Sequence, residues 1–267
     1  MVLPALPLLV IVAALLLWPL GILVLQSVTV DGMAFSPANY LRILRSTRYL
    51  QSFINTAFLA IGSTLLALIL CTPAAMYIEG NSGYGRKWLA VLLTIPLSLP
   101  GIVIGFFVIL NLGLTGAIPK LIEWLTGERQ FTVAYTFWGL LLGYVYFQIP
   151  RVVLVIRGSV ASIDPDIIDT ARTLGAPTWR VYTAIILPTL RPALLNAASL
   201  SLATAFGAYG TAATLSRGYR VIPLEIAAAF TESFQPGLAA AMSILLAFIT
   251  SVILLSVTWF GDRRSYR

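Results

Sequence analysis

The clearest chemical pattern in the sequence is a group of three aspartates, Asp164, Asp166 and Asp169. Their spacing suits the start of a helix, where Asp164 would cap free backbone N–H groups and the acids of the first turn would favour the helix dipole. Pro165 suits the first helical position, and Gly175 suits the left-handed residue that ends a helix. The pattern therefore predicts a short surface helix, not a catalytic centre.

The chain lacks the side chains that most enzymes and metal sites use. It has no histidine and a single cysteine, Cys71, which lies in an apolar run. These counts exclude a Ser-His-Asp triad, an intrachain disulfide and a cysteine-based metal cluster. The sequence also has no Gly-x-x-x-x-Gly-Lys-Ser/Thr loop to hold the phosphates of ATP. We therefore expect no catalytic residue, no metal site and no bound cofactor on this chain.

The segment that begins with the three aspartates, residues 164–188, has the apolar spacing of a helical hairpin. Four apolar residues recur on one face of the first helix, namely Ile167, Ile168, Ala171 and Leu174. A second helix is expected over residues 177–187, with Pro188 turning the chain and Pro192 starting the next apolar segment. A hairpin with an apolar face and no catalytic group suits docking into a groove on a partner protein.

The composition shows that lipid must surround much of the chain. Of its 267 residues, 59% are hydrophobic and 10% are charged, and the mean hydropathy is +0.92. Soluble domains average about 45–50% apolar and about 25% charged residues. Six apolar stretches reach the length of about 20 residues that a spanning helix needs. They are residues 6–28, 53–78, 88–112, 136–156, 193–215 and 238–260. The expected fold is an all-α integral membrane protein with six transmembrane helices and the hairpin of residues 164–188.

These stretches divide the chain into three parts. Residues 1–50 hold the first transmembrane helix and an extracytoplasmic interfacial segment, residues 51–260 hold the other five helices with the hairpin, and residues 261–267 form a basic tail. If both termini are cytosolic, the cytosolic loops hold somewhat more Lys and Arg than the extracytoplasmic loops. An excess of Lys and Arg marks the cytosolic side of a membrane protein. We therefore expect cytosolic termini and a cytosolic hairpin. The net charge of +7 then reflects loops, not nucleic-acid binding.

The expected spans carry no Asp, Glu or Lys near their middle. Ion-coupled carriers usually keep such residues in the membrane to bind the coupling ion, so the energy for uphill transport must enter from another subunit. A translocation path would then be lined by neutral polar side chains. The candidates are Ser98, Asn196, Ser199, Thr204 and Tyr209. The alternative is that these residues serve close helix packing and interhelical hydrogen bonds.

One gapped pattern in the hairpin resembles a known family signature. It consists of Asp169-Thr170-Ala171, three residues, Gly175, nine residues, and Ile185-x-Leu187-Pro188. It resembles the signature Glu-Ala-Ala-x3-Gly-x9-Ile-x-Leu-Pro of permease subunits of binding-protein-dependent type I ABC importers. Both spacings match, whereas Asp169 replaces Glu and Thr170 replaces the first Ala. The resemblance extends over most of the chain, from about residue 52 to residue 260.

The resemblance implies a permease subunit in a bacterial inner membrane. The first hairpin helix would be the coupling helix, which sits in a cleft of a cytosolic ATPase. The implied coupling residues are Asp164, Asp166, Asp169, Thr170, Ala171, Leu174, Gly175, Ile185, Leu187 and Pro188. The implied partners are two ATP-binding subunits that carry ATP and Mg, a second permease that we expect to be a different chain, and an extracytoplasmic solute-binding protein.

The substrate follows less directly from the sequence. The hairpin and its flanking residues look most like permeases of polyamine, sulfate, molybdate, ferric-iron and phosphonate importers. Overall resemblance favours the polyamine (spermidine/putrescine) type, with sulfate, ferric iron or phosphonate as alternatives. A secondary carrier or channel is a more distant alternative, which the uncharged span centres argue against. A membrane enzyme is a further one, against which the lack of histidine argues.

Overall fold

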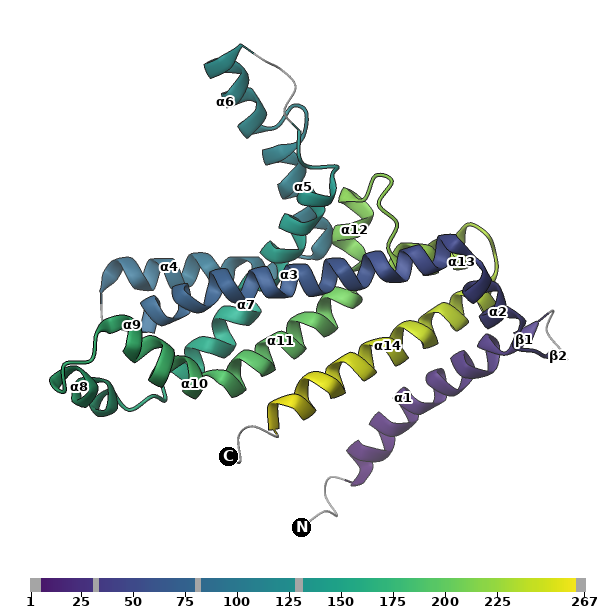
Figure 1. Ribbon diagram of the computed structural model, residues 1–267. Coiled ribbons are helices and arrows are strands. Elements are labelled where there is room, and N and C mark those ends of the chain that lie inside the picture. Colours follow the sequence, from purple (N-terminus) through teal and green to yellow (C-terminus); the bar gives the residue numbers. More distant parts are fainter. Residues whose placement is uncertain (1–5, 31–33, 80–82, 128–131, 263–267) are drawn as a thin grey trace. The chain divides into compact units, whose positions relative to one another are not determined.

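A computed structural model describes residues 6–30, 34–79, 83–127 and 132–262 (Figure 1). Most of the basic tail expected at residues 261–267 therefore lies outside the described residues. The chain forms two compact units. The first comprises residues 1–56 and 220–251, and the second comprises residues 57–219 and 252–267.

The first unit contains the N-terminal helix and the segments around residue 230. Its elements are α1 (Leu6–Ser27), β1 (Thr29–Val30), β2 (Ala34–Phe35), α2 (Ala38–Arg45), the start of α3 (Thr47–Glu79), α13 (Ile222–Thr231) and most of α14 (Pro236–Asp262). The two short strands pair antiparallel. The core of this unit is formed by Ile43 of α2, Ile222 of α13, and Leu238 and Met242 of α14. The interfacial segment expected before residue 51 thus contains a helix, α2, and α3 already begins at Thr47.

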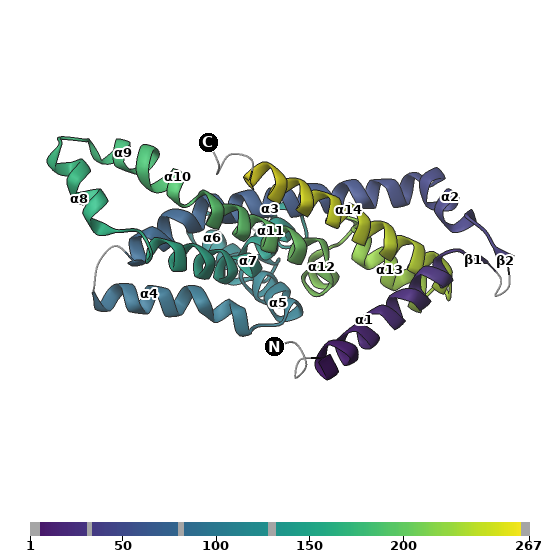
Figure 2. The ribbon, with the colours of Figure 1, turned by 90° about the horizontal axis from the view of Figure 1, so that it is seen from below.

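The second unit contains the rest of α3 and the central part of the chain. Its elements are α4 (Tyr84–Thr94), the 3-10 helix η2 (Ile95–Ser98), α5 (Gly101–Leu112), α6 (Ala117–Thr126), α7 (Phe137–Val160), α8 (Pro165–Thr173), α9 (Thr178–Val181), the π-helix η3 (Tyr182–Ile186), α10 (Leu187–Thr189), α11 (Arg191–Phe206) and α12 (Tyr209–Leu215). Figure 1 and Figure 2 both show α8, α9 and α10 at one end of this unit.

The core of the second unit joins the long helices to this end. Cys71 of α3, Val152 and Ile156 of α7, Val181 of α9 and Leu190 belong to one buried cluster. Helix α11 packs on α7 and buries a stripe of small side chains with helical spacing, namely Ala193, Ala197, Ser201 and Ala205. Small residues let two helix backbones approach closely within a membrane.

The described helices agree with an all-α membrane fold. Five are long and apolar enough to span a membrane: Val10–Ser27, Thr47–Glu79, Gly101–Thr126, Phe137–Val160 and Pro236–Trp259. A sixth span results if Thr178–Thr189 and Arg191–Phe206, which meet at an angle of 62°, are counted as one bent pair. The prediction of an all-helical membrane protein with about six spans is therefore confirmed.

The expected third span, residues 88–112, in which Pro96 and Pro100 predict kinks, is interrupted at those prolines and is not one continuous helix. The apolar stretch is divided into α4, η2 and α5. Leu99 is extended (φ −91°, ψ 127°), because the ring of Pro100 disfavours the helical conformation of the preceding residue. Pro96 adds a residue without an N–H donor inside the short 3-10 helix. The span at this position is Gly101–Thr126.

The expected fifth span, residues 193–215, also divides in two. Helix α11 ends at Phe206, and α12 begins at Tyr209. Helix α12 instead packs tightly on α5, where the Thr211 hydroxyl donates to the Gly101 carbonyl at 3.1 Å. A Cβ atom at Gly105 of α5 would overlap the Thr214 side chain. Glycine at this position therefore permits the close approach of α5 and α12.

Candidate functional site

Helix α8 begins as its sequence predicts. The Asp164 carboxylate accepts a hydrogen bond from the Asp166 N–H at 3.0 Å, and Pro165 occupies the first helical position. This cap satisfies one of the N–H groups that have no partner inside the helix. Asp166 places a negative charge in the first turn, where the helix dipole favours it.

Helix α8 ends in a closed turn around Gly175. Gly175 has φ +82°, its N–H donates to the Arg172 carbonyl at 2.9 Å, and the Ala176 N–H donates to the Ala171 carbonyl at 3.1 Å. These two bonds define a Schellman motif, which fixes the direction in which the chain leaves the helix. An added Cβ atom at Gly175 would have no neighbour within 4 Å, so the backbone conformation alone explains the glycine.

The single apolar face expected on α8 is divided in the structure. Ile168 and Ala171 pack against the core cluster of the second unit, whereas Ile167 is 51% exposed and Leu174 is 84% exposed. The expectation of one continuous face is therefore wrong, because α9 and the core cluster cover only one side of the helix. The helix is anchored on one side and presents Ile167 and Leu174 on the other.

The second arm of the hairpin bends later than expected. Residues 178–189 are helical throughout, with the π-helix η3 just before Pro188. The wider turn of a π-helix accommodates a proline that would otherwise clash with the preceding turn. Pro188 therefore does not turn the chain, and the bend of 62° lies at Leu190. Pro192 lies in the first turn of α11, as expected.

The remaining predicted hairpin residues differ in burial. Ile185 packs against the core cluster, whereas Leu187 and Pro188 are exposed. Asp164, Asp166, Asp169 and Thr170 are also exposed. The carboxylate of Asp169 lies 3.6 Å from the Arg172 guanidinium, and both side chains are mostly in solvent. Such a pair contributes little to stability, so Asp169 remains available to a partner.

A cavity of about 540 Å³ lies behind the hairpin, lined by α8, α9 and the ends of α3, α4 and α7. Glu79 of α3 and Arg157 of α7 form an ion pair at 2.5 Å near its rim. The Arg86 guanidinium lies 4.3 Å from the centre of the Tyr77 ring. Charged and aromatic side chains thus lie behind the hairpin, and the sequence pattern did not predict that they lie close together.

The five predicted path residues are distributed over three elements. Ser98 lies in η2 and is exposed, and Tyr209 starts α12 and is half exposed. On α11, Asn196 is exposed on a side away from the buried stripe of small residues. Thr204 is only partly exposed, lies beside that stripe, and donates to the Leu200 and Ser201 carbonyls at 3.0 Å. Ser199 has a buried hydroxyl without a hydrogen-bond partner among the described residues. Packing within this chain therefore accounts for Thr204 but accounts poorly for the exposed Asn196.

Two polar side chains inside the second unit were not among the predicted site residues. Gln148 of α7 is fully buried and donates to the Ser63 hydroxyl of α3 at 2.8 Å. Arg151 of α7 donates to the Phe147 carbonyl at 2.6 Å, and its guanidinium lies 4.2 Å from the centre of the Phe147 ring. Their presence in an apolar span was a usable signal, because polar groups at membrane depth are costly.

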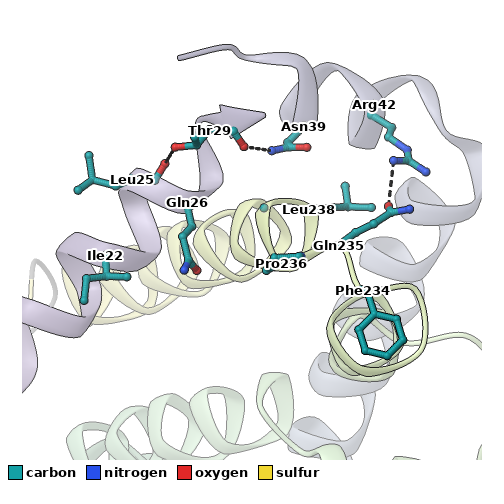
Figure 3. A pocket seen from close by; sticks show the side chains of 11 residues that line it. Ile22, Leu25, Gln26, Thr29, Asn39, Arg42, Phe234, Gln235, Pro236 and Leu238 are labelled. Atoms are coloured by element: carbon teal, nitrogen blue, oxygen red, sulfur yellow. Dashed lines mark hydrogen bonds between the residues drawn. The ribbon is translucent and has the colours of Figure 1, made fainter. Parts of the chain in front are cut away.

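The first unit has a cavity of its own, of about 700 Å³, between the end of α1, α2 and the start of α14 (Figure 3). Polar side chains at its wall bind one another. Arg42 donates to the Gln235 side chain at 2.9 Å, and Asn39 donates to the Ser27 carbonyl at 3.1 Å. The described residues contain no group of three or more Cys, Asp or Glu side chains that would hold a metal ion here or elsewhere.

Sequence comparison assigns most of the chain to one family model. Residues 72–266 match the model described as "Binding-protein-dependent transport system inner membrane component". The molybdenum transport system permease protein ModB of Haemophilus influenzae is 30% identical over 219 residues, which cover 79% of this chain and 93% of that protein. The putative molybdenum transport system permease protein YvgM of Bacillus subtilis is 33% identical over 146 residues, 55% of this chain and 63% of that protein.

More distant relatives and solved structures extend the comparison. Sulfate permease 2, chloroplastic, of Chlamydomonas reinhardtii is 27% identical over 80% of this chain and 57% of that protein. A chain in the crystal structure of a bacterial alginate ABC transporter, in complex with a periplasmic protein that carries an alginate pentasaccharide, superposes with a TM-score of 0.84. It has 20% identity over 98% of this chain and 94% of that chain, which supports the fold alone.

Proposed function

This chain belongs to the family of binding-protein-dependent transport system inner membrane components, the permease subunits of type I ABC importers, and on that premise we propose that its 164–188 hairpin couples ATP hydrolysis on another subunit to transport. The chain itself is the transport component and not the ATP-hydrolysing one. The geometry of α8 is the observation that supports the proposal, because one side of this helix packs on the core cluster and the other side is exposed.

The free side of α8 suits a cleft on a partner. Leu174 is 84% exposed at the end of the helix, and Asp169 and Thr170 are exposed one turn earlier. The anchored side, Ile168 and Ala171, packs on the same core cluster as α3 and α7. A displacement of α8 by a partner is therefore passed to two long helices through packed side chains, which deform little.

A site-specific cross-link tests this assignment. Cys71 is the only cysteine of the chain and is buried, so Cys71→Ser followed by Leu174→Cys gives one reactive thiol at the hairpin. A thiol-reactive photocross-linker at residue 174 should capture the co-purified ATP-binding subunit. The matched control is Lys120→Cys on the exposed side of α6, which should not capture it. Equal capture from both positions, or none from residue 174, would contradict the assignment.

The proposed assembly follows from the family and the loop charges. Two cytosolic ATP-binding subunits carry ATP and Mg, a second and different permease chain completes the pore, and an extracytoplasmic binding protein delivers the solute. Both chain termini and the hairpin lie in the cytosol of a bacterium, with the chain in its inner membrane. Protease or thiol-labelling accessibility from each side of sealed vesicles checks this orientation.

The exposed stripe of α11 supports a translocation path between two permeases. The exposed residues on this side of α11 are Pro192, Asn196 and Leu200, with Thr204 partly exposed farther along the same row, and the neighbouring row of small residues is buried against α7. The Asn196 amide facing lipid would be unfavourable, whereas the same side chain facing a second permease would line a polar passage. Ser98, Ser199 and Tyr209 remain the other proposed path residues.

The substrate class that we propose is a tetrahedral oxyanion such as molybdate or sulfate. Permeases to which the chain is similar are named for molybdenum and sulfate, and their names do not support the polyamine interpretation. The expected spans have no acid near their middle to bind a polycation and no base there to bind an anion. Toward the cytosolic end of the expected fourth span, however, Arg151 of α7 forms no ion pair with a described carboxylate and bonds within its own helix. A cation of this kind suits the passage of an anion.

Identification of the bound ligand tests the substrate class. The binding protein that co-purifies with the chain should retain molybdate or sulfate, measured by elemental mass spectrometry, and molybdate should stimulate ATP hydrolysis by the reconstituted complex. Spermidine or putrescine in the binding protein would restore the polyamine interpretation. Ferric iron or a phosphonate in the binding protein would contradict the oxyanion and identify that ligand as the substrate.

A further inference from the structure

A small basic cavity lies beside the hairpin in the second unit, separate from the proposed ATPase contact. Its volume is about 440 Å³, and α3, α4 and α7 each contribute to its wall. The charged side chains that line it are Glu79 of α3, Arg86 and Lys87 of α4, and Arg157 of α7. Three cations therefore face one carboxylate, and the cavity has an excess of positive charge.

The cations are not equally neutralised. Arg157 forms an ion pair with Glu79 at 2.5 Å, which uses the one carboxylate of the cavity. Arg86 stacks on the Tyr77 ring at 4.3 Å, and its buried Nη1 atom has no hydrogen-bond partner among the described residues. A buried guanidinium nitrogen without a partner is costly, so an anion that accepts its hydrogen bond would be stabilising.

Aromatic side chains lie beside the two cations that α4 contributes to this cavity. Tyr77 near the end of α3, and Tyr84 and Trp88 in the first turns of α4, are all exposed large side chains. The Lys87 ammonium lies 5.9 Å from the centre of the Tyr84 ring. Tyr and Trp are enriched at the level of lipid headgroups, where their rings have an apolar and a polar side. The cavity therefore lies at the depth of the headgroup phosphates.

We infer that this cavity binds the phosphate group of an anionic phospholipid, with Arg86 as the principal ligand and Lys87 as a second cation. Guanidinium groups bind phosphate oxygens through charge-assisted hydrogen bonds with matching geometry. Basic cavities between membrane helices on the cytosolic side are suited to lipid headgroups of this charge. The cytosolic placement rests on the proposed function, whereas the phosphate chemistry rests on the cavity alone.

Native mass spectrometry of the full-length chain in detergent tests the inference. Phosphatidylglycerol should bind more tightly than phosphatidylcholine of the same acyl chains. Arg86→Gln and Lys87→Gln should each weaken phosphatidylglycerol binding about fivefold and leave phosphatidylcholine binding unchanged. Lys87 is exposed, so Lys87→Gln keeps the fold and remains informative if Arg86→Gln does not. The double control Arg45→Gln with Lys120→Gln removes two positive charges, one more than either cavity variant, from exposed positions outside the cavity and should have no effect.

Separate arms distinguish the lipid from soluble phosphate. In one outcome, the chain in phosphatidylcholine micelles binds inorganic phosphate, Arg86→Gln abolishes that binding, and phosphatidylglycerol shows no selective binding. This outcome would support the phosphate chemistry and overturn the lipid as its source. Equal binding of both lipids by the wild type, or equal phosphatidylglycerol binding by wild type and both cavity variants, would overturn the site. None of these outcomes depends on the hairpin or on an ATPase, so the proposed function is tested separately.

Discussion

Arg48 and Glu225 form an ion pair within the first unit that ties the start of α3 to α13. The Arg48 Nη2 atom lies 2.8 Å from Glu225 Oε2, and Arg48 Nε donates to both carboxylate oxygens at 3.1 and 3.0 Å. The Glu225 side chain is 6% exposed, and that of Arg48 is 52% exposed. The carboxylate is therefore the buried member, and it depends on the arginine for compensation.

Arg48→Gln should destabilise the protein because it leaves this buried carboxylate without its counter-ion. Removal of one partner costs about 3–5 kcal/mol when the whole pair is buried. We expect about 1–2 kcal/mol here, because half of the arginine is in solvent, where screening reduces the contribution. A lower midpoint of thermal unfolding in detergent, followed by size-exclusion chromatography, is the measurement.

The control for this change is Arg45→Gln, an exposed arginine at the end of α2. It removes the same charge without leaving a buried acid and should unfold at the wild-type temperature. Equal midpoints for Arg48→Gln and Arg45→Gln would show that the ion pair does not stabilise the first unit.

Gly175→Ala should weaken the closed end of α8. The residue has φ +82°, a conformation that costs an L-residue about 1–2 kcal/mol, while an added Cβ atom meets no neighbour within 4 Å. The change therefore acts on the direction of the hairpin and not on core packing. We expect normal amounts of assembled complex with reduced coupling, measured as uptake per ATP hydrolysed in proteoliposomes.

Gly158 supplies a matched control for that substitution. It lies in the last turns of α7, and an added Cβ atom there also meets nothing within 4 Å. Because Gly158 has no positive φ, alanine there should be neutral or stabilising by up to about 1 kcal/mol. Normal coupling in Gly175→Ala, or the same coupling loss in Gly158→Ala, would show that the left-handed turn does not matter for transport.

The ends of α8 could be predicted from sequence because local chemistry determines them. Asp164 and Gly175 act within one turn of their own positions, as cap and left-handed stop. The division of the apolar face could not be predicted. Ile168 and Leu174 mark the two edges of the expected face, about 120° apart on the helix, and only tertiary packing against α9 and the core cluster buries one edge and leaves the other exposed.

The errors in the spans have a similar origin. Hydropathy identified the apolar stretches, and the prolines of the third stretch predicted kinks. The full break at Leu99, before Pro100, is a backbone effect that an average over about 20 residues does not contain. The basic cavity was also not predictable, since Glu79, Arg86 and Arg157 come from three helices. Their charges are visible in the sequence, but their proximity depends on tertiary packing.

Ser63→Ala should destabilise the second unit although it removes a single oxygen. Gln148 is fully buried, donates to the Ser63 hydroxyl at 2.8 Å, and its Oε1 atom has no partner among the described residues. Loss of the serine leaves the buried amide without this bond, at a cost of about 1 kcal/mol for a pair between membrane helices. Gln148→Met, of similar size, removes the unsatisfied amide and should cost less than Ser63→Ala. The comparison uses thermal unfolding midpoints, and a larger loss for Gln148→Met would contradict it.

Substitutions on the two sides of α11 separate a translocation path from helix packing. Asn196 lies on the exposed stripe, and Ser201 is fully buried in the row of small residues. Asn196→Leu should leave assembly with the ATP-binding subunit intact and reduce uptake, because it replaces a polar lining by an apolar one. Ser201→Leu should reduce assembly, because overpacking of a filled core costs about 1–3 kcal/mol. Co-purification of subunits measures assembly, and uptake into proteoliposomes measures transport. If Asn196→Leu loses the second permease instead of transport, the exposed stripe is a contact between permeases and the path lies elsewhere.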